Sequence, residues 1–135
     1  MREGRPDPGR MVVSMEPVAP RFGVEARTEG HSAVLTLRGE LDHDTAPLLR
    51  QRLDQVFDAA GATATTVVVV DCSALDFCDS TGLNVLLTAR LRAVEVGIGI
   101  RLAALRGHVV RMFEITGAGD VFSIHPDLAD ALAAG

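Results

Sequence analysis

The chain has 135 residues, 47% of them hydrophobic and 23% charged, with a formal net charge of −5. This length and balance are typical of one globular domain with a sizeable core. The negative charge argues against a nucleic-acid surface, which needs clustered basic residues, and since all 13 cationic side chains are arginines, chemistry that requires a lysine ammonium group is excluded.

Targeting signals and metal-binding patterns are also missing from the sequence. No apolar stretch approaches the roughly 20 residues of a membrane span, and no signal-peptide pattern follows the first residue. Cys72 and Cys78 have no His or Cys partner at metal-ligand spacing. We therefore expect a cytoplasmic protein without membrane contact, metal or cofactor, in which both thiols are small buried apolar groups.

The first residues of the chain differ in composition from the rest. Residues 1–20 combine four prolines with charged residues and show no apolar periodicity, so they predict a flexible N-terminal tail in front of one domain over residues 21–135. Apolar and polar residues alternate from Phe22 to Arg27, and a second strand is predicted from Ser32 to Arg38. The short Glu29–Gly30 turn between them makes the pair an antiparallel hairpin.

A polar loop, residues 39–45, leads into a first predicted helix, Thr45 to Ala60. Asp44 or Thr45 can cap this helix with its side chain, and Gly61 ends it. The predicted core positions recur at helical spacing: Leu48, Leu49, Leu53, Val56, Phe57 and Ala60. The four valines within Thr65–Asp71 then predict a central strand that is covered on both faces.

A second helix is predicted from Ser80 to Val96, with Leu83, Leu87, Leu91 and Val94 as its apolar stripe. The remaining predicted elements are a strand, a helix, a strand and a helix over residues 98–105, 108–116, 121–124 and 127–134. Strands that alternate with helices indicate parallel pairing with right-handed crossovers. The sequence thus predicts an α/β fold of order ββαβαβαβα, with a mixed, mainly parallel central sheet and helices packed against it.

The junction before the second helix is the strongest candidate for a functional site. Ser80 is predicted at the helix N-terminus, where free N–H groups carry roughly half a positive charge. A phosphate on Ser80 would add about −1.5 to −2 charge, favoured by the helix terminus and opposed by Asp79, Asp76 and Asp42. The local pattern alone favours ordinary helix capping, because Asp-Ser-Thr before an apolar run is a common helix start.

Two further chemistries are open to this junction. Asp71, Asp76 and Asp79 could form an acidic metal or phospho-aspartate site, although such sites in receiver domains use a lysine that this chain lacks. Ser80 could be a hydrolytic nucleophile with His43 as its base, although the Gly-x-Ser-x-Gly pattern is absent.

The motifs together resemble a known family, the STAS domains of the anti-sigma-factor-antagonist type. Phe77 to Leu83 is similar to the family signature, an apolar pair followed by Asp-Ser-Ser/Thr-Gly-Leu. Gly39-Glu40-Leu41-Asp42, with His43 and Thr45, resembles the Gly-Glu-Leu/Ile-Asp loop of the family, and Val109–Gly117 resembles its third-helix pattern. Cys78 and Ala118 depart from the usual residues without touching the phosphoacceptor.

The resemblance implies a binding switch without catalytic activity and with the STAS fold. In its unphosphorylated form such a protein binds an anti-sigma factor that is also a serine kinase, and the sigma factor is released. Phosphorylation of Ser80 abolishes binding, and a PP2C-type phosphatase restores it. The residues that match the recognised loops are Gly39, Glu40, Asp42, Thr45, Asp79, Thr81, Gly82 and Leu83.

The family also contains members with a different use of the same surface. The alternative is a constitutive STAS interaction module, such as the partner of a lipid-transport ATPase or a subunit of a stress-signalling complex. In either case we expect a monomer or weak dimer with protein partners.

Overall fold

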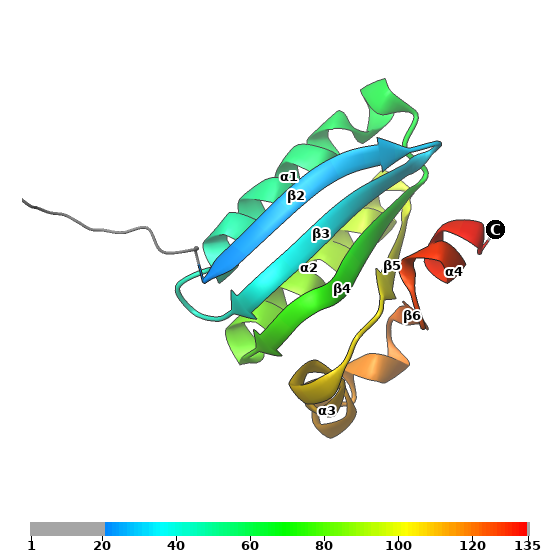
Figure 1. The fold of residues 1–135 in the computed structure, drawn as a ribbon. Coiled ribbons are helices and arrows are strands. Elements are labelled where there is room, and N and C mark those ends of the chain that lie inside the picture. Colours follow the sequence, from blue (N-terminus) through cyan, green and yellow to red (C-terminus); the bar gives the residue numbers. More distant parts are fainter. Residues whose placement is uncertain (1–20, 135) are drawn as a thin grey trace, which may run out of the picture.

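The fold is built on a five-stranded sheet, seen in a computed structural model that describes residues 21–134 (Figure 1). The strands, which follow one another across the sheet in chain order, are β2 (Phe22–Glu29), β3 (Ser32–Leu41), β4 (Val67–Cys78), β5 (Gly99–Ala103) and β6 (Ser123–His125). The helices are α1 (Ala46–Thr63), α2 (Ser80–Val96), α3 (Gly107–Thr116) and α4 (Leu128–Ala133), with a 3-10 turn η1 (Ala118–Asp120). The tail predicted over residues 1–20 lies outside the described residues.

The pairing of the strands confirms the predicted topology. β2 and β3 form the antiparallel hairpin, whereas the pairs β3–β4, β4–β5 and β5–β6 are all parallel. Each parallel connection passes through a helix, so the order ββαβαβαβα and the mixed, mainly parallel sheet are both as predicted.

The valines of β4 are buried on both faces of the sheet, as expected for a central strand. Val68 and Val70 belong to the main hydrophobic cluster with α1 and α2, which lie side by side on one face (Figure 1). Val67 and Val69 belong to a second cluster with Ala131 of α4. None of the four valines is more than 7% exposed, and burial of each stabilises the fold by about 1.5–3 kcal/mol.

β4 is longer than the sequence predicts, because it continues from Asp71 to Cys78 instead of ending in a loop. Two register shifts against β3 accommodate the polar residues, the first between the pairs Thr36–Asp71 and Arg38–Ala74. At this irregularity the Asp71 carboxylate accepts a hydrogen bond from the Ser73 N–H at 3.0 Å. Bulges of this kind let a strand absorb extra residues while Leu75 and Cys78 still face the core.

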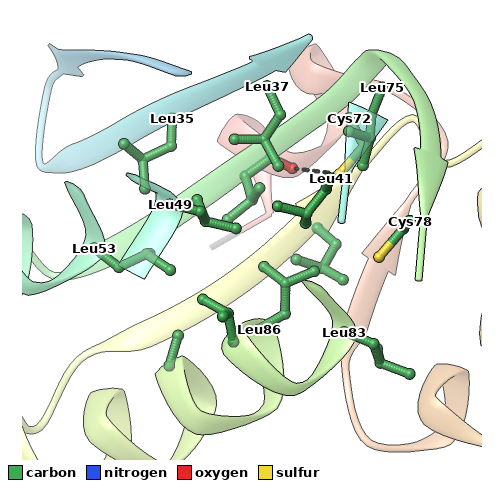
Figure 2. Packing of buried hydrophobic residues seen from close by; sticks show 14 of the residues in the cluster. Leu35, Leu37, Leu41, Leu49, Leu53, Cys72, Leu75, Cys78, Leu83 and Leu86 are labelled. Carbon is green, nitrogen blue, oxygen red and sulfur yellow. Dashed lines mark hydrogen bonds between the residues drawn. The ribbon is translucent and has the colours of Figure 1, made fainter. Parts of the chain in front are cut away.

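Both cysteines are free and buried, which confirms the prediction made for them. Figure 2 shows Cys72 and Cys78 among the leucines of β3, α1 and α2. Burial raises the pKa of both thiols, and for Cys78 burial together with the charge of Asp79 raises the pKa to about 12. Neither thiol is therefore a thiolate at neutral pH.

Three details of the helices differ from the sequence prediction. Leu48 of α1, predicted on the apolar face of the helix, is 37% exposed. Leu91 and Val94 of α2 are 61% and 69% exposed. The buried face instead runs through Leu83, Val85, Leu86, Ala89 and Ala93, since small alanines let the helix lie close to the sheet. Helix α1 passes through Gly61 and ends at Thr63, where Ala64 adopts a left-handed conformation (φ 56°). No helix between residues 21 and 134 combines the length and the apolar character needed to cross a membrane.

Candidate functional site

Ser80 is the first residue of α2 and its side chain is exposed. The residue before it, Asp79, has extended backbone (φ −96°, ψ −175°) and caps the helix, because its Oδ1 accepts a hydrogen bond from the Gly82 N–H at 2.9 Å. The capping role of this cluster thus belongs to Asp79. The Ser80 hydroxyl is therefore not used to cap the helix. It lies at a helix N-terminus, where a negative charge is favoured.

The loop between β3 and α1 lies directly beside this helix start, as the sequence predicts for the ends of neighbouring parallel strands. The Asp79 N–H donates to the Leu41 carbonyl at 3.0 Å, and the His43 N–H donates to Oδ2 of Asp79 at 3.1 Å. Asp79 therefore joins the two loops with its backbone and with its side chain.

Gly82 and Leu83 set the distance between α2 and this loop. A Cβ atom on Gly82 would lie 2.5 Å from Cγ of Leu41, so only glycine permits the contact. Leu83 is 5% exposed and anchors the first turn of α2 in the core, where Figure 2 shows it with Leu86. Of the predicted partner-binding residues on this helix, Thr81 is half-buried and faces a groove of about 520 Å³ that runs along α1.

Asp42 holds the β3–α1 loop in shape. Its Oδ1 accepts hydrogen bonds from the N–H groups of Asp44 and Thr45 at 3.0 and 3.1 Å. The Thr45 hydroxyl donates to the Glu40 carbonyl at 2.9 Å and accepts from the Asp42 N–H at 2.8 Å. The prediction that Asp44 or Thr45 caps α1 with its side chain is wrong, because Thr45 occupies the N-cap position without such a bond and uses its hydroxyl to close the loop.

Arg21 is a neighbour of this loop that the sequence analysis missed. Its Nη1 lies 2.6 Å from Oδ2 of Asp42 and 3.4 Å from Oε1 of Glu40, and its Nη2 lies 3.5 Å from Oδ2 of Asp44. The predicted hairpin could have indicated this contact. A turn at Glu29–Gly30 pairs Phe22 with Gly39, and this pairing places Arg21 next to Glu40.

The ion pair changes the titration of both groups. The hydrogen bond from Arg21 is the main cause that lowers the pKa of Asp42 below its usual range, and the N–H groups and hydroxyl around the carboxylate act in the same direction. The same bond raises the pKa of Arg21. Asp42 is therefore charged in the folded protein even at pH values where free aspartate is protonated.

The lowered pKa predicts how an Asp42→Asn variant depends on pH. A carboxyl whose pKa is lower in the folded than in the unfolded state stabilises the fold above the unfolded pKa of about 4, and this stabilisation is lost as the pH falls through the folded value. Urea titrations at pH 7 should show Asp42→Asn slightly less stable than the wild type, since the ion pair is exposed to solvent, and the difference should shrink as the pH falls below about 4. A difference that stays constant over this range would contradict the role given to the charge.

The structure does not bring together the three aspartates of the alternative metal or phospho-aspartate site. Asp71 is buried at the β4 irregularity, Asp76 is exposed and pairs with Arg106 at 3.6 Å, and Asp79 caps α2. Asp71 and Asp76 lie five positions apart along one strand, roughly 16 Å at the rise of a regular strand. Within residues 21–134 no three His, Cys, Asp or Glu side chains gather in a way that could hold a metal ion. His43 lies beside this helix start through its backbone N–H, but within residues 21–134 no hydrogen bond joins its side chain to Ser80.

The chain is similar in sequence and in fold to proteins named as antagonists of anti-sigma factors. A Mycobacterium tuberculosis protein named as an anti-anti-sigma factor is 32% identical over 118 residues, covering 86% of this chain and 78% of its own. The anti-sigma-B factor antagonist of Bacillus subtilis is 28% identical over 103 residues, covering 76% of this chain and 90% of its own. A crystal structure of an anti-sigma factor antagonist from Mycobacterium paratuberculosis superposes with a TM-score of 0.74 at 29% identity, covering 86% of this chain and 96% of its own.

The family model described as the STAS domain matches residues 24–131, from the first strand to the last helix. Both motif loops that meet at Asp79 lie inside this range. The chain belongs to the STAS domain family.

Proposed function

We propose that this protein is an anti-sigma-factor antagonist whose binding is controlled at Ser80. In the unphosphorylated form it binds a serine-kinase anti-sigma factor, and the sigma factor is released. The kinase phosphorylates Ser80 and so ends the interaction, and a PP2C-type phosphatase restores it. The protein itself catalyses no reaction. The names of the relatives support the antagonist role, since they belong to antagonists of anti-sigma factors.

The assignment of Ser80 as the phosphorylation site rests on one observation at the start of α2, where the helix is capped by the residue before Ser80 and not by Ser80 itself. Asp79 caps the helix and ties it to the Glu40–Thr45 segment, while Ser80 is exposed beside both. A kinase can therefore reach the hydroxyl without disturbing the cap. A phosphate on Ser80 would lie beside Asp79, which is bound to the loop that follows β3, so that a partner docked on this surface would meet about 1.5 to 2 added negative charges.

Phosphorylation in vitro tests this proposal. The full chain is incubated with ATP and each kinase-type anti-sigma factor of the same organism, and the product is mapped by mass spectrometry. We expect one phosphate, on Ser80, with the wild type and with Thr81→Val, and no phosphate with Ser80→Ala. Labelling of Ser80→Ala to the extent of the wild type would refute the site, and absence of binding to every such kinase would refute the antagonist role.

A further inference from the structure

The side chain of Arg21 lies on the carboxylates of the segment Glu40–Asp44, which we call the acidic loop. Asp42 is its nearest partner, and Glu40 and Asp44 lie within 3.5 Å of the same guanidinium. In the part of the chain that the structure describes, Arg21 is the one cation within 4.0 Å of these three acids. The acidic loop is thus partly neutralised from within the molecule.

A partner that docks on this surface has to carry positive charge. The loop presents three carboxylates, with Glu40 and Asp44 52% and 77% exposed, and Asp79 adds a fourth beside it. Complementary charge across an interface fixes register and speeds association, so a basic side chain of the partner is the natural counterpart of Asp42. Arg21 occupies that position in the free protein.

We propose that Arg21 is a built-in competitor of the partner, whose guanidinium neutralises part of the charge of the acidic loop and so weakens the complex. This inference rests on the proposed function. To contact Asp42, a basic group of the partner has to displace Arg21 or bind next to it against like-charge repulsion, and both reduce affinity. The affinity of this protein for the anti-sigma factor is then reduced by Arg21, a residue outside both sequence motifs.

The shape of the loop does not depend on the Arg21 side chain. The Glu40 N–H donates to the Arg21 carbonyl at 2.7 Å, a bond that any residue at position 21 can make. Asp42 still accepts the N–H groups of Asp44 and Thr45, and the Asp79 N–H still donates to Leu41. Since the Arg21 side chain is 51% exposed, its ion pairs contribute little to stability. Its replacement therefore changes the charge of the loop without unfolding it.

The chain offers a matched control at the other end of β2. Arg27 pairs with Glu29 at 3.0 Å, and their side chains are 46% and 47% exposed, close to the value for Arg21. Arg27→Gln removes one positive charge, as Arg21→Gln does, but it breaks one exposed ion pair where Arg21→Gln breaks three, and it lies far from the acidic loop. A difference between the two variants reports the position of the charge rather than its amount.

The first experiment uses the isolated protein. Arginine amide is titrated into the wild type, Arg21→Gln and Arg27→Gln, and the amide NMR signals of residues 40–45 are followed. These signals should saturate at a lower arginine amide concentration in Arg21→Gln, and Arg27→Gln should behave as the wild type. Equal titration curves for the wild type and Arg21→Gln would overturn the proposal.

The second experiment uses the anti-sigma factor that phosphorylates Ser80 in the assay above. Calorimetry should give a dissociation constant about fivefold lower for Arg21→Gln than for the wild type, the scale of an exposed ion pair, and an unchanged constant for Arg27→Gln. Equal or weaker binding of Arg21→Gln, or equal gains in both variants, would overturn the competitor role. If no anti-sigma factor binds the wild type, the proposed function fails, and the arginine amide titration alone decides whether Arg21 shields the loop.

Discussion

Replacing Gly39 by alanine should lower the free energy of unfolding by about 3 kcal/mol, because two costs combine at this position. Gly39 has φ +86°, a left-handed conformation that side chains disfavour, and it lies at a register shift between β3 and β4. A Cβ atom there would also overlap the carbonyl group of Arg21, which accepts the Glu40 N–H. The backbone of the loop has to move before alanine fits.

Gly30→Ala is the matched control for this prediction. Gly30 has φ +60° in the hairpin turn, but a Cβ atom there would meet no atom within 4 Å. The free energy of unfolding of this variant should therefore fall only by the cost of the left-handed conformation, about 1 kcal/mol. Urea unfolding of both variants, compared with the wild type at pH 7, separates the two contributions. Equal losses for Gly39→Ala and Gly30→Ala would show that the contact with Arg21 relaxes without cost.

Replacing Ser80 by aspartate should weaken binding of the anti-sigma factor by about a hundredfold, which corresponds to ~3 kcal/mol. The new carboxylate adds negative charge beside Asp79, at the edge of the surface that we propose for the partner. Desolvation of this charge opposes association, because the basic side chain that we expect in the partner lies opposite Asp42 and not opposite position 80. The fold should be unaffected, because an acidic residue in the first turn of a helix is favourable.

Ser123→Asp provides the control, since it makes the same substitution at an exposed serine of β6. Calorimetry with the kinase-type anti-sigma factor should show near wild-type affinity for Ser123→Asp, and urea unfolding should show both variants folded. Unchanged affinity of Ser80→Asp would contradict the electrostatic account of the switch. Equal losses in both variants would point to net charge as the cause.

The type and order of the elements were predictable because each has a local signal in the sequence. The four valines mark the central strand, and the turn at Glu29–Gly30 marks the hairpin. The end of β4 was not predictable, because Asp71 and Ser73 are typical of a turn and only pairing with β3 keeps this segment extended. The buried face of α2 was misassigned because Leu91 and Val94 are more hydrophobic than the alanines that pack on the sheet.

The candidate site was predictable only in part, for a similar reason. Asp79 and Ser80 carry a local capping pattern, so their place at the start of α2 is as predicted. The contact of Asp42 with Arg21 depends on the tertiary arrangement of the hairpin and the loop, because the two residues are 21 positions apart. Which residues the partner contacts, and whether Ser80 is modified, stay predictions.

The double attachment of Asp79 has a mechanical consequence. Because its N–H and its carboxylate bind Leu41, His43 and Gly82 at once, the two loops are held together as one unit, with Ser80 exposed at its edge. With the backbone of the two loops held in this way, a phosphate on Ser80 would add charge and volume at the surface without a rearrangement of the loops beneath it. A partner would then distinguish the two forms directly, without waiting for a conformational change.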